Sequence, residues 1–120
     1  MAALEPKAYS APDKPLRFAV IGAGMAGVLC GIKLREAGFD HFTIYEKADR
    51  VGGTWRENTY PGIACDVPAH LYSYSFAPNP EWSHRFAPGD EIQAYFETIT
   101  RDYGLGRYIR FGDAVTRLRY

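Results

Sequence analysis

Three glycines and one glutamate have the spacing of a nucleotide-binding loop. Gly22, Gly24 and Gly27 form the pattern G-x-G-x-x-G, and Glu46 follows Gly27 by 19 residues. We expect Gly22 to make a tight turn after a strand, Gly24 to admit a pyrophosphate to the backbone, and Gly27 to let the next helix pack closely. The pyrophosphate would lie at a helix N-terminus, where free N–H groups and the helix dipole attract anions. The pattern therefore predicts dinucleotide binding.

Glu46 indicates which dinucleotide the loop would take. A carboxylate at the end of the second strand can accept hydrogen bonds from both ribose hydroxyls of an adenosine. Its charge would repel a nucleotide that carries a 2′-phosphate. The loop is therefore predicted to hold FAD or NAD and not NADP. A glycine-rich turn beside a surface glutamate is the alternative that these residues leave open.

The apolar pattern predicts the elements that would position these residues. A short apolar run before Gly22 is typical of a buried parallel strand, and the strand–helix–strand order that follows is a βαβ unit. A second helix is expected to begin at Asp90 as its N-cap residue, with Gln93 completing a capping box. The pattern predicts strands over residues 18–21, 42–45, 108–111 and 114–120, and helices over 25–37 and 90–103.

Residues 48–89 show little regular pattern but contain many glycines, prolines and aromatic residues. A stretch of this length without clear elements usually indicates a binding loop. Within it, Gly52 and Gly53 form a second glycine pair that would let another backbone segment approach the same pyrophosphate. A simple NAD dehydrogenase has no need of such a pair, so it favours FAD.

These motifs together resemble the FAD-binding part of class B flavoprotein monooxygenases, the flavin-containing and Baeyer–Villiger monooxygenases. The resemblance rests on G-x-G-x-x-G, Glu46 and G-G-T-W at residues 52–55, and it runs from about Phe18 to the end of the chain. The segments Y-P-G-I-A-C-D-V at 60–67 and Y-S-Y-S-F at 72–76 resemble the Baeyer–Villiger branch. One departure is that Arg56-Glu57 replaces the aromatic pair common in that branch.

The resemblance implies an α/β fold, a three-layer Rossmann-type FAD-binding domain. We expect a flexible leader over residues 1–15 and the N-terminal portion of that domain over 16–120, with the NADPH domain in later sequence. It also implies that Asp66 lies beside the flavin and acts in catalysis by helping to position an arginine from later sequence. The candidate cofactor-binding residues are Gly22, Ala23, Gly24, Met25, Ala26, Gly27, Glu46, Lys47, Gly53, Thr54, Trp55, Asp66, Tyr72 and Val115.

The function that the resemblance implies is that of an FAD- and NADPH-dependent monooxygenase. Such an enzyme uses O₂ to form a flavin C4a-(hydro)peroxide, which transfers one oxygen atom to a ketone or to a nitrogen or sulfur nucleophile. The 120 residues alone are expected to be inactive. The alternatives are another FAD- or NAD-dependent oxidoreductase and a truncated, non-catalytic nucleotide-binding fragment.

The composition argues against several other functions. The 14 Lys and Arg residues balance 14 Asp and Glu residues, which argues against a nucleic-acid or anionic-membrane partner. Cys30 and Cys65 are too few for a thiolate metal site, and the three histidines lack metal-ligand spacing. Neither a secretory signal nor a membrane-spanning run is visible in the sequence. We therefore expect a cytoplasmic protein that acts on a small molecule without a metal.

Overall fold

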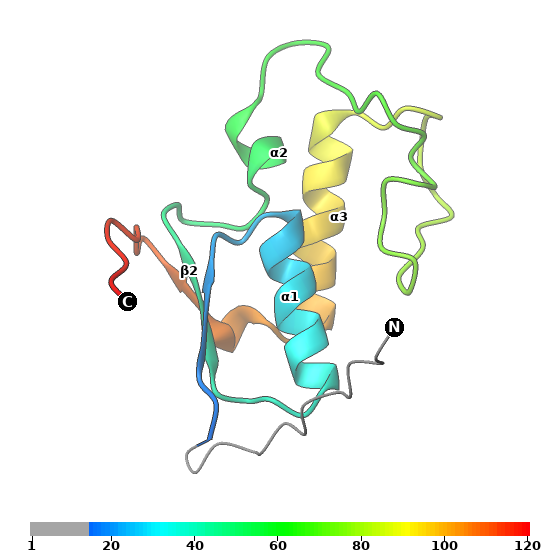
Figure 1. Cartoon of the computed structure of the whole chain (residues 1–120). Coiled ribbons are helices and arrows are strands. Elements are labelled where there is room, and N and C mark those ends of the chain that lie inside the picture. The colour runs from blue at the N-terminus through cyan, green and yellow to red at the C-terminus, as the bar shows by residue number, and fades with distance from the viewer. Residues whose placement is uncertain (1–14) are drawn as a thin grey trace, which may run out of the picture.

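A computed structural model describes residues 15–120, so the predicted leader lies outside the described residues except for Pro15. The elements follow one another along the chain in the order shown in Figure 1. They are β1 (Phe18–Ile21), α1 (Met25–Glu36), β2 (Phe42–Glu46), α2 (Thr54–Glu57), α3 (Gly89–Asp102), the 3₁₀ helix η1 (Gly106–Tyr108) and β3 (Ile109–Phe111).

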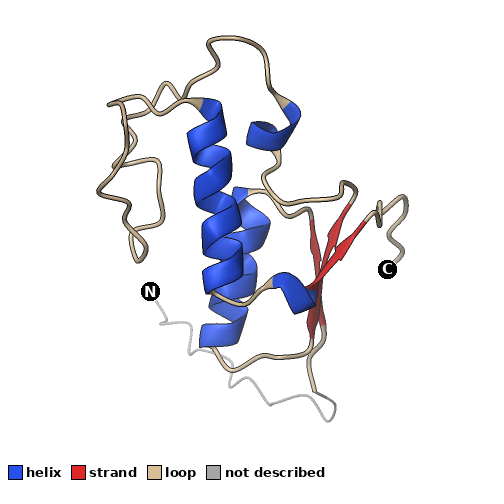
Figure 2. Cartoon of the chain, turned by 180° about the vertical axis from the view of Figure 1, so that it is seen from behind, coloured by secondary structure: helices blue, strands red, loops and turns tan. Residues whose placement is uncertain are grey.

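The three strands form a parallel sheet in the order β1-β2-β3. Phe18 is paired with Phe42, and Ile44 with Ile109. Figure 2 shows the helices on one side of the sheet. Along β2 the residues facing the helices are buried and the alternate ones are half-buried, as expected for a strand with one covered face. This is the predicted α/β, Rossmann-type arrangement.

Helix α1 approaches the sheet closely because two glycines lie on its buried face. Gly27 and Gly31 are one helical turn apart, and a Cβ on Gly31 would lie 2.9 Å from Cδ1 of Ile44 in β2. Val28 and Ile32 fill the rest of this face. The helix ends one residue earlier than predicted, and Gly38 then adopts a φ of +83°, a left-handed conformation that favours glycine.

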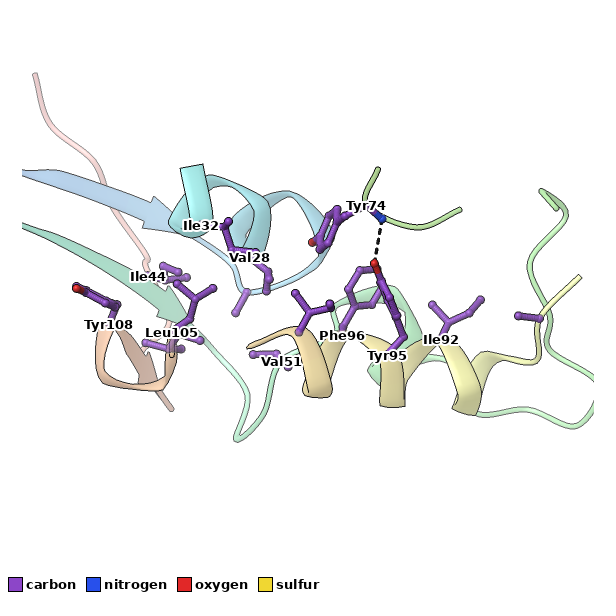
Figure 3. Close-up of a cluster of buried hydrophobic side chains, with 14 of the residues drawn as sticks. Val28, Ile32, Ile44, Val51, Tyr74, Ile92, Tyr95, Phe96, Leu105 and Tyr108 are labelled. Carbon is purple, nitrogen blue, oxygen red and sulfur yellow. Dashed lines mark hydrogen bonds between the residues drawn. The ribbon is translucent and has the colours of Figure 1, made fainter. Parts of the chain in front are cut away.

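Helix α3 packs beside α1 in both views (Figures 1 and 2) and buries Ile92, Phe96 and Ile99 along one stripe. Figure 3 shows Phe96 within the cluster of buried side chains that joins the two helices. At the sheet end of this cluster, the ring of Phe42 stacks on Tyr108 with 4.2 Å between the ring centroids. Within residues 15–120, no helix has the length and apolar character needed to cross a membrane.

Three local predictions differ from the structure. Helix α3 begins at Gly89 with Pro88 at the N-cap, so Asp90 lies in the first turn instead, where Oδ1 accepts from the Glu91 amide at 2.9 Å. The short helix α2 was not predicted at all. Residues 114–120 form no strand, because β3 already occupies the edge of β2 and no other strand is described beside them.

One tyrosine of α3 holds the long loop between α2 and α3 at two points. The Tyr95 hydroxyl donates to the Ala77 carbonyl at 2.7 Å and accepts from the buried Tyr74 amide at 3.0 Å, the bond drawn in Figure 3. Burial raises the pKa of Tyr95 above its ordinary value, so the hydroxyl keeps its proton. One side chain thus satisfies two backbone groups that are 18 and 21 residues away.

Replacing Tyr95 by phenylalanine is expected to lower the free energy of unfolding by about 1–3 kcal/mol, because it leaves the buried Tyr74 amide without an acceptor. Denaturant unfolding followed by circular dichroism measures this. Tyr60→Phe is the matched control, since Tyr60 is 61% exposed. Equal stabilities of the two variants would contradict the assigned role of the Tyr95 hydroxyl.

Candidate nucleotide-binding site

The first glycine loop lies at the carboxyl end of β1 and turns back over the start of α1. Gly22 adopts a φ of +88°, and its amide donates to the Tyr45 carbonyl at 2.8 Å. A Cβ on Gly27 would lie 1.8 Å from the Gly22 carbonyl oxygen. Only glycine therefore fits at position 27 while the loop keeps this turn.

The second glycine pair lies directly against the first loop. The Gly52 amide donates to the Ala23 carbonyl at 3.0 Å. A Cβ on Gly24 would lie 3.5 Å from the Cα of Gly53. Gly52 and Gly53 have φ values of +127° and +55°, which side chains rarely tolerate. Two bare backbone segments thus adjoin at one place.

Glu46 ends β2 with its side chain buried between these loops. Its Oε2 accepts from the Ala23 amide at 2.7 Å, and its Oε1 accepts from the Ala48 amide at 2.9 Å. Burial alone would raise the pKa of Glu46. The two amides and the Arg56 guanidinium together lower it by more, so the pKa of Glu46 lies below its ordinary value. The carboxylate is therefore ionised at neutral pH.

Arg56 in α2 is the cation bonded to Glu46, and it was absent from the predicted site residues. Its Nη1 donates to Glu46 Oε1 at 3.0 Å and to the Arg50 carbonyl at 3.0 Å, while Nη2 donates to Glu57 Oε1 at 2.9 Å. The side chains of Arg56 and Glu46 are only 8% and 4% exposed. The sequence held only an indirect signal for Arg56. A buried carboxylate requires a partner, but the spacing of residues along the sequence does not show which residue supplies it.

A cavity of about 270 Å³ lies beside Glu46. Six of the predicted residues line it. The segment after β3 reaches this cavity because the Asp113 amide donates a hydrogen bond to the Glu46 carbonyl. The predicted residues that line it are Gly22, Gly24, Glu46, Lys47, Gly53 and Val115, and its wall also includes Arg56, Glu57 and Asp113.

Four of the other predicted residues do not line this cavity. Ala23 is fully buried in the core, and Met25, Ala26 and Gly27 form the first turn of α1.

Two of the residues that do line the cavity have further structural features. Lys47 pairs with Glu57 at 2.9 Å. Val115 takes its place in the cavity wall from an irregular segment and not from the predicted strand.

Trp55 and Tyr72 are brought together elsewhere. Trp55 Nε1 donates to the Tyr72 hydroxyl at 3.2 Å, and Trp55 lines a larger cavity of about 680 Å³ with Tyr60, Phe86 and Gln93. Thr54 and Asp66 are exposed, and neither is among the residues that line these two cavities. Among the described residues, no group of three or more His, Cys, Asp or Glu side chains is placed to hold a metal ion.

The site combines groups that bind rather than groups that react. Free backbone at Gly22, Gly24 and Gly53 allows close approach of a phosphate, and the start of α1 favours negative charge. Glu46 supplies an ionised acceptor for a hydroxyl in the same cavity. The volume of the cavity suits part of a dinucleotide, since pockets for whole ligands are roughly 300–1,000 Å³.

Comparisons with known proteins agree with this geometry. A model of the NAD(P)-binding Rossmann-like domain matches residues 20–88. A Baeyer-Villiger monooxygenase of Streptomyces coelicolor is 49% identical over 105 residues, which cover 88% of this chain and 20% of that protein. A Baeyer-Villiger monooxygenase of Pseudomonas aeruginosa is 52% identical over 89 residues, covering 74% and 17%. The chain thus spans about a fifth of the length of these curated relatives.

Solved structures show the same relation. An oxidized steroid monooxygenase bound to NADP superposes with a TM-score of 0.75 at 40% identity, covering 79% of this chain and 19% of that one. The OTEMO complex with FAD and NADP (form 1) gives a TM-score of 0.81 at 33% identity, covering 88% and 20%.

Proposed function

We propose that residues 16–120 hold the ADP half of FAD. The proposal starts from the family: the chain belongs to the NAD(P)-binding Rossmann-like domain family. It corresponds to the FAD-binding N-terminal portion of class B flavoprotein monooxygenases. The protein that carries this portion is then an FAD- and NADPH-dependent monooxygenase. Its substrates are O₂ and a small organic molecule. Because the compared proteins include Baeyer-Villiger and cyclohexanone monooxygenases, a ketone is the proposed substrate class.

The observation that carries this proposal is the contact between the two glycine loops beside Glu46. The Gly52 amide bonds to the Ala23 carbonyl at 3.0 Å, and Gly53 lies so close to Gly24 that a Cβ on Gly24 would be 3.5 Å from the Cα of Gly53. Gly24 and Gly53 both line the cavity beside Glu46, so a pyrophosphate bound there would meet two backbone segments that carry no side chain at these positions. The residues therefore fit FAD, with the pyrophosphate at the glycines and the ribose at Glu46.

FAD, when bound, supplies the redox chemistry that activates O₂ with electrons from NADPH. The described residues bind and orient it. Trp55 of α2 and Tyr72 of the long loop are joined by a hydrogen bond and an edge-to-face ring contact, and we propose that this aromatic pair packs against the cofactor. Asp66 is exposed on that loop. Its carboxylate is thus accessible to a cationic partner from the rest of the protein, and its catalytic role remains a prediction.

The activity is tested on the full-length purified protein. We expect a flavin absorption spectrum, NADPH oxidation that a ketone accelerates, and an ester or lactone detected by mass spectrometry. A sulfoxide formed from a thioether, with ketones left unchanged, would assign the heteroatom branch instead. A protein that is colourless and does not bind added FAD would overturn the proposal.

Gly24→Ala tests the phosphate loop itself. The added methyl group would lie in ordinary contact with Gly53 at 3.5 Å, and Gly24 has a φ of −78°, so the fold should remain. The methyl group would lie between the two glycine segments that line the cavity and would hinder close approach of the pyrophosphate to their backbone. We expect FAD affinity to fall about tenfold or more, equivalent to about 1.4 kcal/mol. Equilibrium titration of the flavin-free protein with FAD measures it.

Gly106→Ala is the matched control for Gly24→Ala. Nothing lies within 4 Å of a Cβ built on Gly106, and the residue is not among those that line the cavity. This variant should bind FAD as the wild type does. Unchanged FAD affinity in Gly24→Ala would remove the pyrophosphate from this loop.

A further inference from the structure

We propose that Arg56 is a positioning residue for the nucleotide, because its guanidinium holds the Glu46 carboxylate so that one oxygen, Oε2, accepts from the ribose. This inference rests on the proposed function, in which the cavity beside Glu46 holds the adenosine part of FAD. Arg56 lines that cavity together with Glu46, Gly22 and Gly24.

The hydrogen bonds of Glu46 leave little accepting capacity. An ionised carboxylate offers about four acceptor positions, two on each oxygen. Oε1 already accepts from the Ala48 amide and from Arg56 Nη1, at 2.9 and 3.0 Å. Among residues 15–120, the Ala23 amide is the sole donor to Oε2, at 2.7 Å. One position on Oε2 therefore remains for a ribose hydroxyl, where the sequence predicted that the carboxylate would bind both hydroxyls.

The position of the Arg56 guanidinium is set on three sides. Both Nη1 hydrogens are used, one by Glu46 and one by the Arg50 carbonyl, and Nη2 bonds to Glu57. Only 8% of the Arg56 side chain is exposed, so it has little room to change rotamer. The Glu46 carboxylate bonded to it is therefore held in one orientation. Oε2 is then already oriented before the nucleotide binds, so binding does not have to order it.

The charges around Glu46 are otherwise paired with one another. Lys47 pairs with Glu57 at 2.9 Å, the Arg50 side chain lies 3.7 Å from Glu97, and Asp113 pairs with Arg110 at 2.8 Å. Arg56 is thus the described cation that acts directly on the carboxylate. It also neutralises Glu46, so discrimination against a 2′-phosphate depends on the need of Oε2 for a hydroxyl donor more than on charge repulsion.

Arg56→Met tests this in the full-length flavoprotein. Removing the guanidinium removes one cause that lowers the pKa of Glu46, so burial, which raises the pKa, is then opposed by the Ala23 and Ala48 amides alone. The carboxyl group should then protonate at higher pH, and FAD release on acidification, followed by flavin fluorescence, should shift to higher pH. Arg56→Lys keeps the charge, so its release profile should lie nearer to that of the wild type.

A second readout compares ADP with 2′,3′-dideoxy-ADP as competitors of FAD rebinding. The wild type should prefer ADP by about tenfold or more, as expected for a hydrogen bond to a charged acceptor. Arg56→Met should lose most of this preference, because Oε2 is no longer oriented. A merely structural role would weaken both competitors equally and leave their ratio unchanged.

Arg50→Met is the matched control. It removes a neighbouring arginine side chain that is 57% exposed, while its backbone carbonyl still accepts from Arg56. This variant should keep the wild-type pH profile and the wild-type preference for ADP. An Arg56→Met variant that keeps both would overturn the role of Arg56 alone, whereas a wild type that binds neither FAD nor ADP would overturn the proposed function.

Discussion

Gly27→Ala is expected to lower the free energy of unfolding by at least about 3 kcal/mol, the upper range for overpacking a buried site. The added Cβ would lie 1.8 Å from the Gly22 carbonyl oxygen and 2.9 Å from its carbon. Both are backbone atoms, so no side-chain rotation can relieve the overlap. Either the turn after β1 or the start of α1 must move, and both position the nucleotide site.

Thermal and denaturant unfolding measure this effect, with FAD binding as a second readout. Gly106→Ala is again the control, with an expected change within about 0.5 kcal/mol, because its added methyl group meets open space. Comparison with Gly24→Ala separates the two glycines, since that variant should bind FAD more weakly while keeping the fold. A Gly27→Ala variant as stable as the wild type would mean that the loop does not adopt this turn.

Glu46→Ala is expected to lower the free energy of unfolding by about 3–5 kcal/mol, the range for removing one partner of a buried ion pair. The Arg56 guanidinium would lose its buried carboxylate partner and keep only the half-exposed Glu57, and the amides of Ala23 and Ala48 would lose their acceptor. The variant should therefore lose stability as well as FAD. Urea unfolding at neutral pH measures the first effect in the absence of flavin.

The effect of Glu46 should also depend on pH. Its pKa in the folded chain is lower than the ordinary value of an unfolded glutamate. The contribution of the ionised Glu46 to folding stability is therefore fully present above the pKa that Glu46 has in the unfolded chain. It is lost as the pH falls through the pKa that Glu46 has in the folded chain. The stability difference between wild type and Glu46→Ala should accordingly shrink below about pH 4, near the ordinary pKa of glutamate.

Glu57→Ala serves as the control for Glu46→Ala, because Glu57 bonds to the same guanidinium at 2.9 Å but its side chain is 47% exposed. Surface ion pairs contribute about 1 kcal/mol or less, so this variant should be close to wild-type stability. If both glutamate variants lost the same stability, the burial of the Glu46–Arg56 pair would not be the cause.

The sequence alone determined the parts of the fold that depend on neighbouring residues. The βαβ unit was predicted with bounds within one residue, because the apolar residues of a strand or helix and the glycines that end it are neighbours in sequence. Gly22 was predicted at a turn, and it has a positive φ. The proximity of Gly52 and Gly53 to the first loop also followed from their short distance in sequence after β2.

Only the tertiary structure decided which distant residues meet. The Arg56–Glu46 pair depends on where α2 folds back, and the place of Val115 depends on the bond from Asp113 to the end of β2. The segment 114–120 has strand-like residues, but none of the described strands pairs with it. Gln93 was predicted to cap a helix, but its side-chain amide donates to the Val51 carbonyl instead. Hydrogen bonds and ion pairs of this kind join residues without periodic spacing, so a single sequence carries no pattern that predicts them.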